Sequence, residues 1–223
     1  MSSFKKAVII VAGGSGSRMQ SAEPKQFLLL KNKPLLFYTI DIFLAFDSDI
    51  QVILVLPENQ IEYWESLQKK YNYSPNITVV SGGQTRFHSV KNGLNAVNND
   101  IEVIGVHDGV RPLVLTETIN HCYEAAYKHQ AAVPVLPLIE SIRKLENKTS
   151  ISISRDTYVS VQTPQCFTHS LLKKAYEQDY NNSFTDDASV VESTGCQIYL
   201  TQGNRENIKI TYPFDLKIAE LFL

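Results

Sequence analysis

The chain has 223 residues and a formal net charge of −2, and 43% of its residues are hydrophobic. This length and mix predict a globular chain with a full apolar core, while the near-neutral charge excludes a broad basic surface for nucleic acid. No run reaches the roughly 20 apolar residues of a membrane span, and Met1–Lys6 lead directly into a strand-like segment, which leaves no room for a signal peptide. The cysteines Cys122, Cys166 and Cys196 are too widely spaced for a disulfide framework or a zinc site. We therefore expect a cytoplasmic protein that binds neither membrane nor nucleic acid.

Strand and helix patterns alternate through the first part of the chain. Continuous apolar runs predict strands, and apolar residues at helical spacing predict the helices between them. The predicted strands are 7–12, 51–56, 77–81, 101–107 and 131–136, and the predicted helices are 34–46, 60–71, 85–97 and 116–129. This alternation predicts an α/β fold, a Rossmann-like and mostly parallel sheet with helices on both faces.

The alternation stops after residue 137. Residues 138–159 contain short β-like stretches around a polar turn and no helix pattern, so we interpret them as a projecting β-arm. An arm of this kind exposes strand edges that favour pairing with a partner, and a second copy of the chain is the natural candidate. Further elements follow at 170–179, 186–193, 197–201 and 213–223. We expect one domain, 1–223, that carries the arm.

A glycine-rich loop follows the first strand. Gly13, Gly14 and Gly16 allow backbone N–H groups to approach a phosphate, and Arg18 and Lys25 add positive charge. A plain glycine turn is the alternative, but the two cations make it the weaker interpretation. The loop therefore predicts a polyphosphate site.

Two common phosphate motifs are excluded at this loop. A P-loop requires Gly-Lys followed by Ser or Thr, which does not occur in the chain. A dinucleotide fingerprint requires a third glycine where Met19 stands, and an acidic residue near Leu56 and Pro57.

Two later clusters follow predicted strands. Residues 82–90 read G-G-Q-T-R-F-H-S-V, which alone could be a glycine turn with a helix cap at Thr85. Residues 107–112 read H-D-G-V-R-P, and Asp108 could cap a helix or hold Mg²⁺ beside a triphosphate. The motifs T-P-Q at 163–165, T-D-D-A at 185–188 and N-I-K-I-T at 207–211 are weak singly, as turns or caps.

Taken in order, these motifs resemble those of the 2-C-methyl-D-erythritol 4-phosphate cytidylyltransferase family. The resemblance rests on A-G-G-x-G-x-R-M, P-K-Q-F, G-G-x-x-R-x-x-S-V, H-D-x-x-R-P, T-P-Q and T-D-D-A, and it covers nearly the whole chain. It implies transfer of CMP from CTP to 2-C-methyl-D-erythritol 4-phosphate, which gives 4-diphosphocytidyl-2-C-methyl-D-erythritol and pyrophosphate.

The resemblance also implies site residues. The catalytic cations would be Arg18, Lys25 and Lys209. The CTP contacts would be Ala12, Gly13, Gly14, Gly16, Gly83, Gln84, Ser89, Asp108 and Gly109, with Asp108 also holding Mg²⁺ or another divalent cation. The acceptor contacts would be Arg111, Ser141, Arg155, Thr163 and Thr185. In relatives the arm serves the neighbouring subunit, so we expect a homodimer in which Ser141 and Arg155 act in trans.

Three alternatives remain at this stage. The same chemistry on ribitol 5-phosphate uses several of the same motifs, although residues 135–144 resemble the methylerythritol enzyme more. A non-catalytic nucleotide-binding protein could keep the fold, but Arg18, Lys25 and Asp108 are all present. An NAD-linked enzyme is disfavoured by the missing fingerprint.

Overall fold

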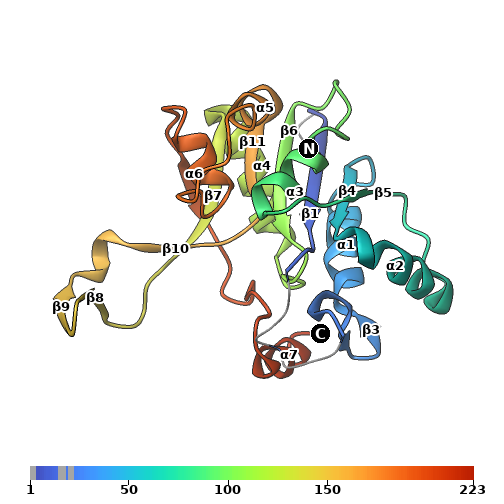
Figure 1. Ribbon diagram of the computed structural model, residues 1–223, viewed down its shortest axis with the longest axis horizontal. Coiled ribbons are helices and arrows are strands. Elements are labelled where there is room, and N and C mark those ends of the chain that lie inside the picture. Colours follow the sequence, from blue (N-terminus) through green and yellow to red (C-terminus); the bar gives the residue numbers. More distant parts are fainter. Residues whose placement is uncertain (1–3, 15–18, 20–22) are drawn as a thin grey trace.

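The computed structural model describes residues 4–14, 19 and 23–223. The predicted site residues Gly16 and Arg18 lie outside the described residues. The centre of the molecule is an eight-stranded sheet whose main path runs β10-β7-β11-β6-β1-β4-β5, with β12 also paired to β7 (Figure 1).

One half of the sheet is wholly parallel. It consists of β1 (Lys6–Val11), β4 (Gln51–Leu56), β5 (Thr78–Ser81) and β6 (Val103–Asp108). Val11 is paired with Asp108, so β1 and β6 end side by side. The loops that follow these strands therefore leave the sheet at one edge, where ligands of parallel sheets bind.

The other half is mixed. It contains β7 (Ala131–Pro137), β10 (Val159–Val161), β11 (Gln165–Thr168) and β12 (Tyr199–Gln202). β11 runs antiparallel to both β6 and β7, and β12 runs parallel to β7. The sequence did not predict β11, because a four-residue strand after a polar turn carries too little periodicity to be distinguished.

Helices cover both faces of the sheet, as predicted. On one face α1 (Leu35–Phe46), α2 (Glu58–Tyr71) and α4 (Thr116–His129) pack in a core with Val8 and Ile10. On the other face α3 (Arg86–Leu94), α5 (His169–Ala175) and α6 (Asp187–Glu192) pack with Ala7 and Ile9. Successive β1 side chains thus serve opposite cores, which explains why the strand reads as a continuous apolar run.

Two smaller features flank the sheet. The β-hairpin of β8 (Ile142–Glu146) and β9 (Thr149–Ile153), followed by a 3-10 turn at Arg155–Thr157, extends away from the body (Figure 1). At another edge, the 3-10 turn Lys25–Phe27 and the short β2 (Leu29–Leu30) and β3 (Lys33–Pro34) lie near α7 (Pro213–Glu220).

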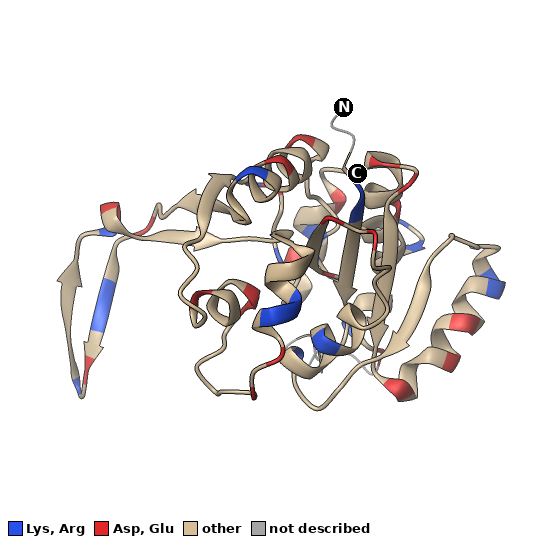
Figure 2. Ribbon diagram, turned by 90° about the horizontal axis from the view of Figure 1, so that it is seen from above, with Lys and Arg blue, Asp and Glu red and all other residues tan. Residues whose placement is uncertain are grey.

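The surface mixes both signs of charge. Figure 2 shows basic and acidic residues interspersed over the helices and on the projecting hairpin. Within the described part of the chain, none of the helices combines the length and the apolar character needed to cross a bilayer.

Candidate active site

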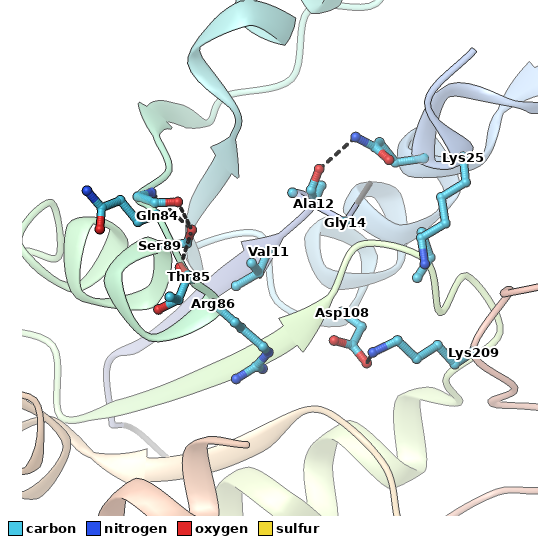
Figure 3. A pocket seen from close by; sticks show the side chains of 14 residues that line it. Val11, Ala12, Gly14, Lys25, Gln84, Thr85, Arg86, Ser89, Asp108 and Lys209 are labelled. Carbon is cyan, nitrogen blue, oxygen red and sulfur yellow. Dashed lines mark hydrogen bonds and ion pairs between the residues drawn. The ribbon is translucent and has the colours of Figure 1, made fainter. Parts of the chain in front are cut away.

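A cavity of about 300 Å³ opens at the carboxyl ends of β1 and β6 (Figure 3). The glycine loop, the loop after β5, the end of β6 and the segment before α7 all contribute to its wall. Its lining residues are Val11, Ala12, Gly13, Gly14, Lys25, Gln26, Gly83, Gln84, Thr85, Arg86, Ser89, Asp108, Val110 and Lys209. Five of the motifs that the sequence singled out therefore meet in one place.

The glycine loop and Lys25 form one wall. A Cβ added at Gly14 would lie 3.3 Å from Lys25 Cε, so the missing side chain leaves room for the lysine. Lys25 is buried, and Gln26 beside it donates from Nε2 to Ala12 O at 2.7 Å. A hydrogen bond thus links Ala12, the residue that follows β1, directly to the P-K-Q segment.

The loop after β5 forms the opposite wall. Thr85 caps α3, because its side chain accepts a hydrogen bond from His88 N. The helix cap expected at Thr85 is therefore present. Ser89 Oγ accepts from Gly83 N at 3.1 Å and donates to Thr85 O at 3.0 Å, which fixes the loop conformation. A Cβ at Gly83 would lie 2.4 Å from His88 Cβ, so this turn requires glycine. Gln84 is exposed and lines the cavity.

Asp108 is the acidic group of the cavity. Its Oδ2 accepts from Arg111 Nε at 3.0 Å and lies 3.0 Å from Lys209 Nζ. Burial alone would raise the pKa of Asp108, but the charges of Lys209, Arg86 and Arg111 outweigh burial and hold that pKa well below its usual range. Asp108 is therefore a carboxylate at neutral pH. Figure 3 shows Lys25 and Lys209 extending into the corner of the cavity that Asp108 occupies.

A buried hydrogen-bond chain lies behind Asp108. His107 Nε2 is 3.1 Å from Arg111 O, which can only accept, so Nε2 carries the proton and Nδ1 is the acceptor. Thr163 Oγ1 then donates to His107 Nδ1 at 3.0 Å and accepts from Asp108 N at 3.1 Å. Burial lowers the pKa of His107 to about 4, so the imidazole is neutral.

Arg111 and Gly109 support the site from outside the cavity. Arg111 Nη1 donates to Asn207 O at 2.7 Å, and Asn207 Nδ2 donates to Thr163 O at 2.8 Å. Gly109 lies beneath the wall, because a Cβ there would be 2.9 Å from Ala12 Cβ. Neither residue lines the cavity, so the structure places them as supports of Asp108 and Ala12 rather than at the cavity wall.

The predicted acceptor residues do not meet in this cavity. Ser141 and Thr185 are exposed, and Arg155 is exposed on the arm, where Nη1 donates to Ile139 O. The hydroxyl of Thr163 is bonded to β6, as described above. Within one described chain, the predicted acceptor contacts are therefore spread over the loop after β6, the arm, the turn before β11 and the segment before α6.

Two cavity residues with defined partners were not among the site residues expected from the sequence. Arg86 forms a bidentate ion pair with Asp187, and Gln26 links Ala12 to Gln60 through its Nε2. The signal for Arg86 was its fixed place in G-G-x-x-R, but the sequence could not show which carboxylate it pairs with. Gln26 lies in the P-K-Q motif and is fully buried.

The residues at the cavity fit one type of metal site. No group of three or more His, Cys, Asp or Glu side chains that could enclose a metal occurs among the described residues. Among the described residues that line the cavity, Asp108 alone offers an ionised carboxylate. This donor set fits Mg²⁺, which is usually held by one or two carboxylates together with substrate oxygens and water.

Known proteins of one enzyme family match this chain over nearly its whole length. The family model described as 2-C-methyl-D-erythritol 4-phosphate cytidylyltransferase matches residues 6–223. The enzyme of that name from Phocaeicola vulgatus is 53% identical over 220 residues, covering 99% of this chain and 100% of the relative. The one from Porphyromonas gingivalis is 46% identical over 220 residues, covering 98% of each.

Solved structures of enzymes in this family share the fold. The Francisella tularensis 2-C-methyl-D-erythritol 4-phosphate cytidylyltransferase superposes with a TM-score of 0.82 at 29% identity, covering 98% of this chain and all of that chain. The Anaerococcus prevotii 4-diphosphocytidyl-2C-methyl-D-erythritol synthase also gives 0.82, at 26% identity and 98% coverage of both. The ribitol 5-phosphate alternative is therefore not favoured. The chain belongs to the 2-C-methyl-D-erythritol 4-phosphate cytidylyltransferase family.

Proposed function

We propose that the cavity binds CTP and transfers its CMP unit to 2-C-methyl-D-erythritol 4-phosphate in isoprenoid precursor synthesis. A phosphate oxygen of the acceptor attacks the α-phosphorus of CTP. A new P–O bond forms, the bond from the α-phosphorus to the bridging oxygen breaks, and pyrophosphate leaves with the electron pair. The observation that carries the proposal is the convergence of the glycine loop, Lys25, Asp108 and Lys209 on one cavity.

The chemistry needs no general base, because the attacking phosphate is already ionised at neutral pH. The obstacle is repulsion between two anions and the charge that develops on the leaving group, so catalysis depends on positioning and on fixed positive charge. Lys25 and Lys209 line the cavity and are suited to this task. Arg18 is assigned to it by resemblance alone. His107 is neutral and buried behind the wall, which fits a supporting role.

Asp108 is the residue that we propose holds Mg²⁺. The bound cation would screen the phosphate charges and fix the triphosphate geometry. Lys209 pairs with the same carboxylate at 3.0 Å and would be free to turn to the α-phosphate once a cation occupies that oxygen.

The loop after β5 is proposed to hold the cytosine. Gly83, Gln84 and Ser89 line the cavity opposite the glycine loop. The turn is rigid, because the Ser89 hydroxyl fixes it and Gly83 permits no side chain.

The acceptor site is proposed to be completed by a second subunit. The arm exposes apolar side chains that a partner could cover, namely Ile139, Leu145, Ile151 and Tyr158. Ser141 and Arg155 lie on this arm, so a homodimer would bring them to the neighbouring cavity. A reducing, cytoplasmic location is supported by the free thiols of Cys122, Cys166 and Cys196.

Pyrophosphate release with CTP and Mg²⁺ tests the proposal. Release with 2-C-methyl-D-erythritol 4-phosphate and not with ribitol 5-phosphate is the expected result. Release with ribitol 5-phosphate alone would preserve the mechanism and overturn the acceptor assignment. Release with neither acceptor would contradict the proposed activity.

A further inference from the structure

One ion pair connects the cavity wall to a helix outside it. Arg86, the first residue of α3, donates from Nη1 to Asp187 Oδ1 at 2.8 Å and from Nη2 to Oδ2 at 2.6 Å. Asp187, the first residue of α6, is fully buried at 0% exposure and also accepts from Tyr176 OH at 2.7 Å. Arg86 lines the cavity and Asp187 does not. The pair therefore spans from the cytosine side of the cavity to the start of α6.

The segment that begins α6 has a second attachment. Gln165 Nε2 donates to Asp186 Oδ2 at 2.8 Å, and Ala188 N donates to Gln165 Oε1 at 2.9 Å. Thr185, the proposed acceptor contact, is the residue directly before this anchored stretch. The position of Thr185 therefore depends on how Asp186, Asp187 and Ala188 are held.

The two sides of the ion pair differ in how firmly the rest of the protein holds them. α3 is fixed in the core by Phe87, Val90 and Leu94, all of which are buried. Residues 181–183 and Thr185 are exposed, and the half-buried Phe184 between them packs against the core and stacks on Phe87. Loss of the pair should therefore displace the segment around Thr185 more than it displaces α3.

The ion pair also limits the hydrogen bonds and the charge that the Arg86 guanidinium can present to a ligand. Both Nη atoms are engaged by one carboxylate, which fixes the plane of the guanidinium and compensates its charge. The fork is therefore held in one orientation by its partner, which suits Arg86 to a positioning role.

We propose that Arg86 and Asp187 are positioning residues that set the acceptor-binding segment at residue 185 relative to the bound CTP. The inference rests on the proposed function, which assigns Thr185 to the acceptor. The pair determines how well the acceptor phosphate is aligned with the α-phosphorus, and CTP binding itself depends on it little.

The test is the Asp187→Asn variant, which preserves the shape of the side chain and removes its charge. We expect the KM for 2-C-methyl-D-erythritol 4-phosphate to rise about tenfold or more, because small misplacements of a positioning group are costly. We expect the Kd for CTP, measured by calorimetry, to stay within about threefold, because α3 has its own core anchors. Arg86→Lys, which replaces the fork by a single point charge, should give an intermediate acceptor KM.

Two control variants separate this role from a general loss of structure. Tyr176→Phe removes one hydrogen bond to Asp187 and leaves the ion pair, so the acceptor KM should change little. Lys91→Gln removes a cation from the same helix that has no part in the pair, and should behave as the wild type.

A double variant keeps the test decisive if Asp187→Asn does not fold. Arg86→Met with Asp187→Leu replaces the buried pair by apolar side chains, an exchange that often preserves stability. We expect a folded protein in which the acceptor KM rises by a larger factor than the Kd for CTP. A folded single or double variant with a wild-type acceptor KM would overturn the inference. The inference would also be overturned if the acceptor KM and the Kd for CTP rose by the same factor, in step with a fall in the melting temperature. Absence of transfer by the wild type would instead overturn the proposed function, and with it the inference.

Discussion

Each charge in the cavity belongs to one side chain, and the neighbours of that side chain determine its protonation state. Asp108 remains ionised despite burial because three cations lie around it, and His107 remains neutral because burial is not offset. Lys25 and Lys209 provide positive charge in the cavity wall, where we propose that the triphosphate binds.

Removal of the Lys25 charge tests this arrangement. Lys25→Ala should lower kcat by about 10²-fold or more, the usual scale for loss of one electrostatic donor in a transition state. Lys173→Ala, on the exposed side of α5, is the matched control and should retain full activity. Steady-state kinetics with CTP and 2-C-methyl-D-erythritol 4-phosphate give the comparison, and an unchanged kcat for Lys25→Ala would refute the role.

Thr163 should act through Asp108. Thr163→Val preserves the shape and removes the hydroxyl, leaving Asp108 N and His107 Nδ1 without their partner. The free energy of unfolding should fall by about 1–3 kcal/mol, the cost of buried polar groups left unpaired, and kcat should fall as well. Thr118→Val is the control, because its buried hydroxyl bonds Asn204 away from the cavity. It should cost similar stability in urea unfolding and leave kcat intact; equal kcat losses in both variants would argue against the role of Thr163.

The neutral His107 predicts a pH dependence of stability. Its pKa in the folded protein is about 4, below the 6.5 of an unperturbed histidine, so the unfolded state binds the extra proton between these pH values. Stability from this group is fully present above pH about 6.5 and is lost as pH falls toward 4. Urea unfolding at a series of pH values should show the free energy rising with pH across this window. His107→Gln should flatten the rise between pH about 5 and 6.5, and an unchanged slope would contradict the assignment.

At the scale of elements, most strands and helices could be predicted and their pairing could not. β4 and α4 have the bounds expected from the sequence, because a long apolar run and a long amphipathic pattern are strong signals. β10 and β11 were missed, since three- and four-residue strands depend on their pairing with β7 and β6 for definition.

The candidate site follows the same division. The motifs indicated which segments carry the charged residues of the site. Because ligands of parallel sheets bind at the carboxyl ends of the strands, the sequence also indicated that Asp108 lies next to the glycine loop. The pairing of Arg86 with Asp187 joins residues 101 positions apart, and the hydroxyl of Thr163 bonds a backbone 55 positions away. Contacts of that range depend on the packed tertiary structure and have no signature in a single sequence.

The turn between β5 and α3 supports a prediction at this scale. Gly83→Ala would place a Cβ 2.4 Å from His88 Cβ, so the loop must shift. The Kd for CTP should rise about tenfold, while the acceptor KM measured at saturating CTP changes less. Ser81→Ala, an exposed position at the end of β5, is the control. Calorimetric titration with CTP gives the result, and a wild-type Kd for Gly83→Ala would place the cytosine elsewhere.

At the scale of the whole molecule, the cavity and the projecting arm are separate features of one chain. The arm extends from the sheet and leaves Leu145 81% exposed and Ile139 57% exposed. The proposed homodimer would cover these side chains with a second copy of the chain and complete the acceptor site.

Sedimentation velocity at micromolar concentration tests that arrangement. The wild type should sediment as a dimer, and Leu145→Glu with Ile151→Glu should shift it toward the monomer, because both changes place charge on the exposed apolar arm. Lys148→Glu, a charge change at the polar tip of the hairpin, is the control. A monomeric wild type would contradict the shared site.

Phosphorus NMR of a single reaction mixture tests the central claim most directly. Wild-type protein with CTP, Mg²⁺ and 2-C-methyl-D-erythritol 4-phosphate should consume both substrates together, and should form a diphosphate-linked product and pyrophosphate in equal amounts. Loss of CTP without consumption of the acceptor, or no change in either, would show that the cavity does not perform cytidylyl transfer to this acceptor.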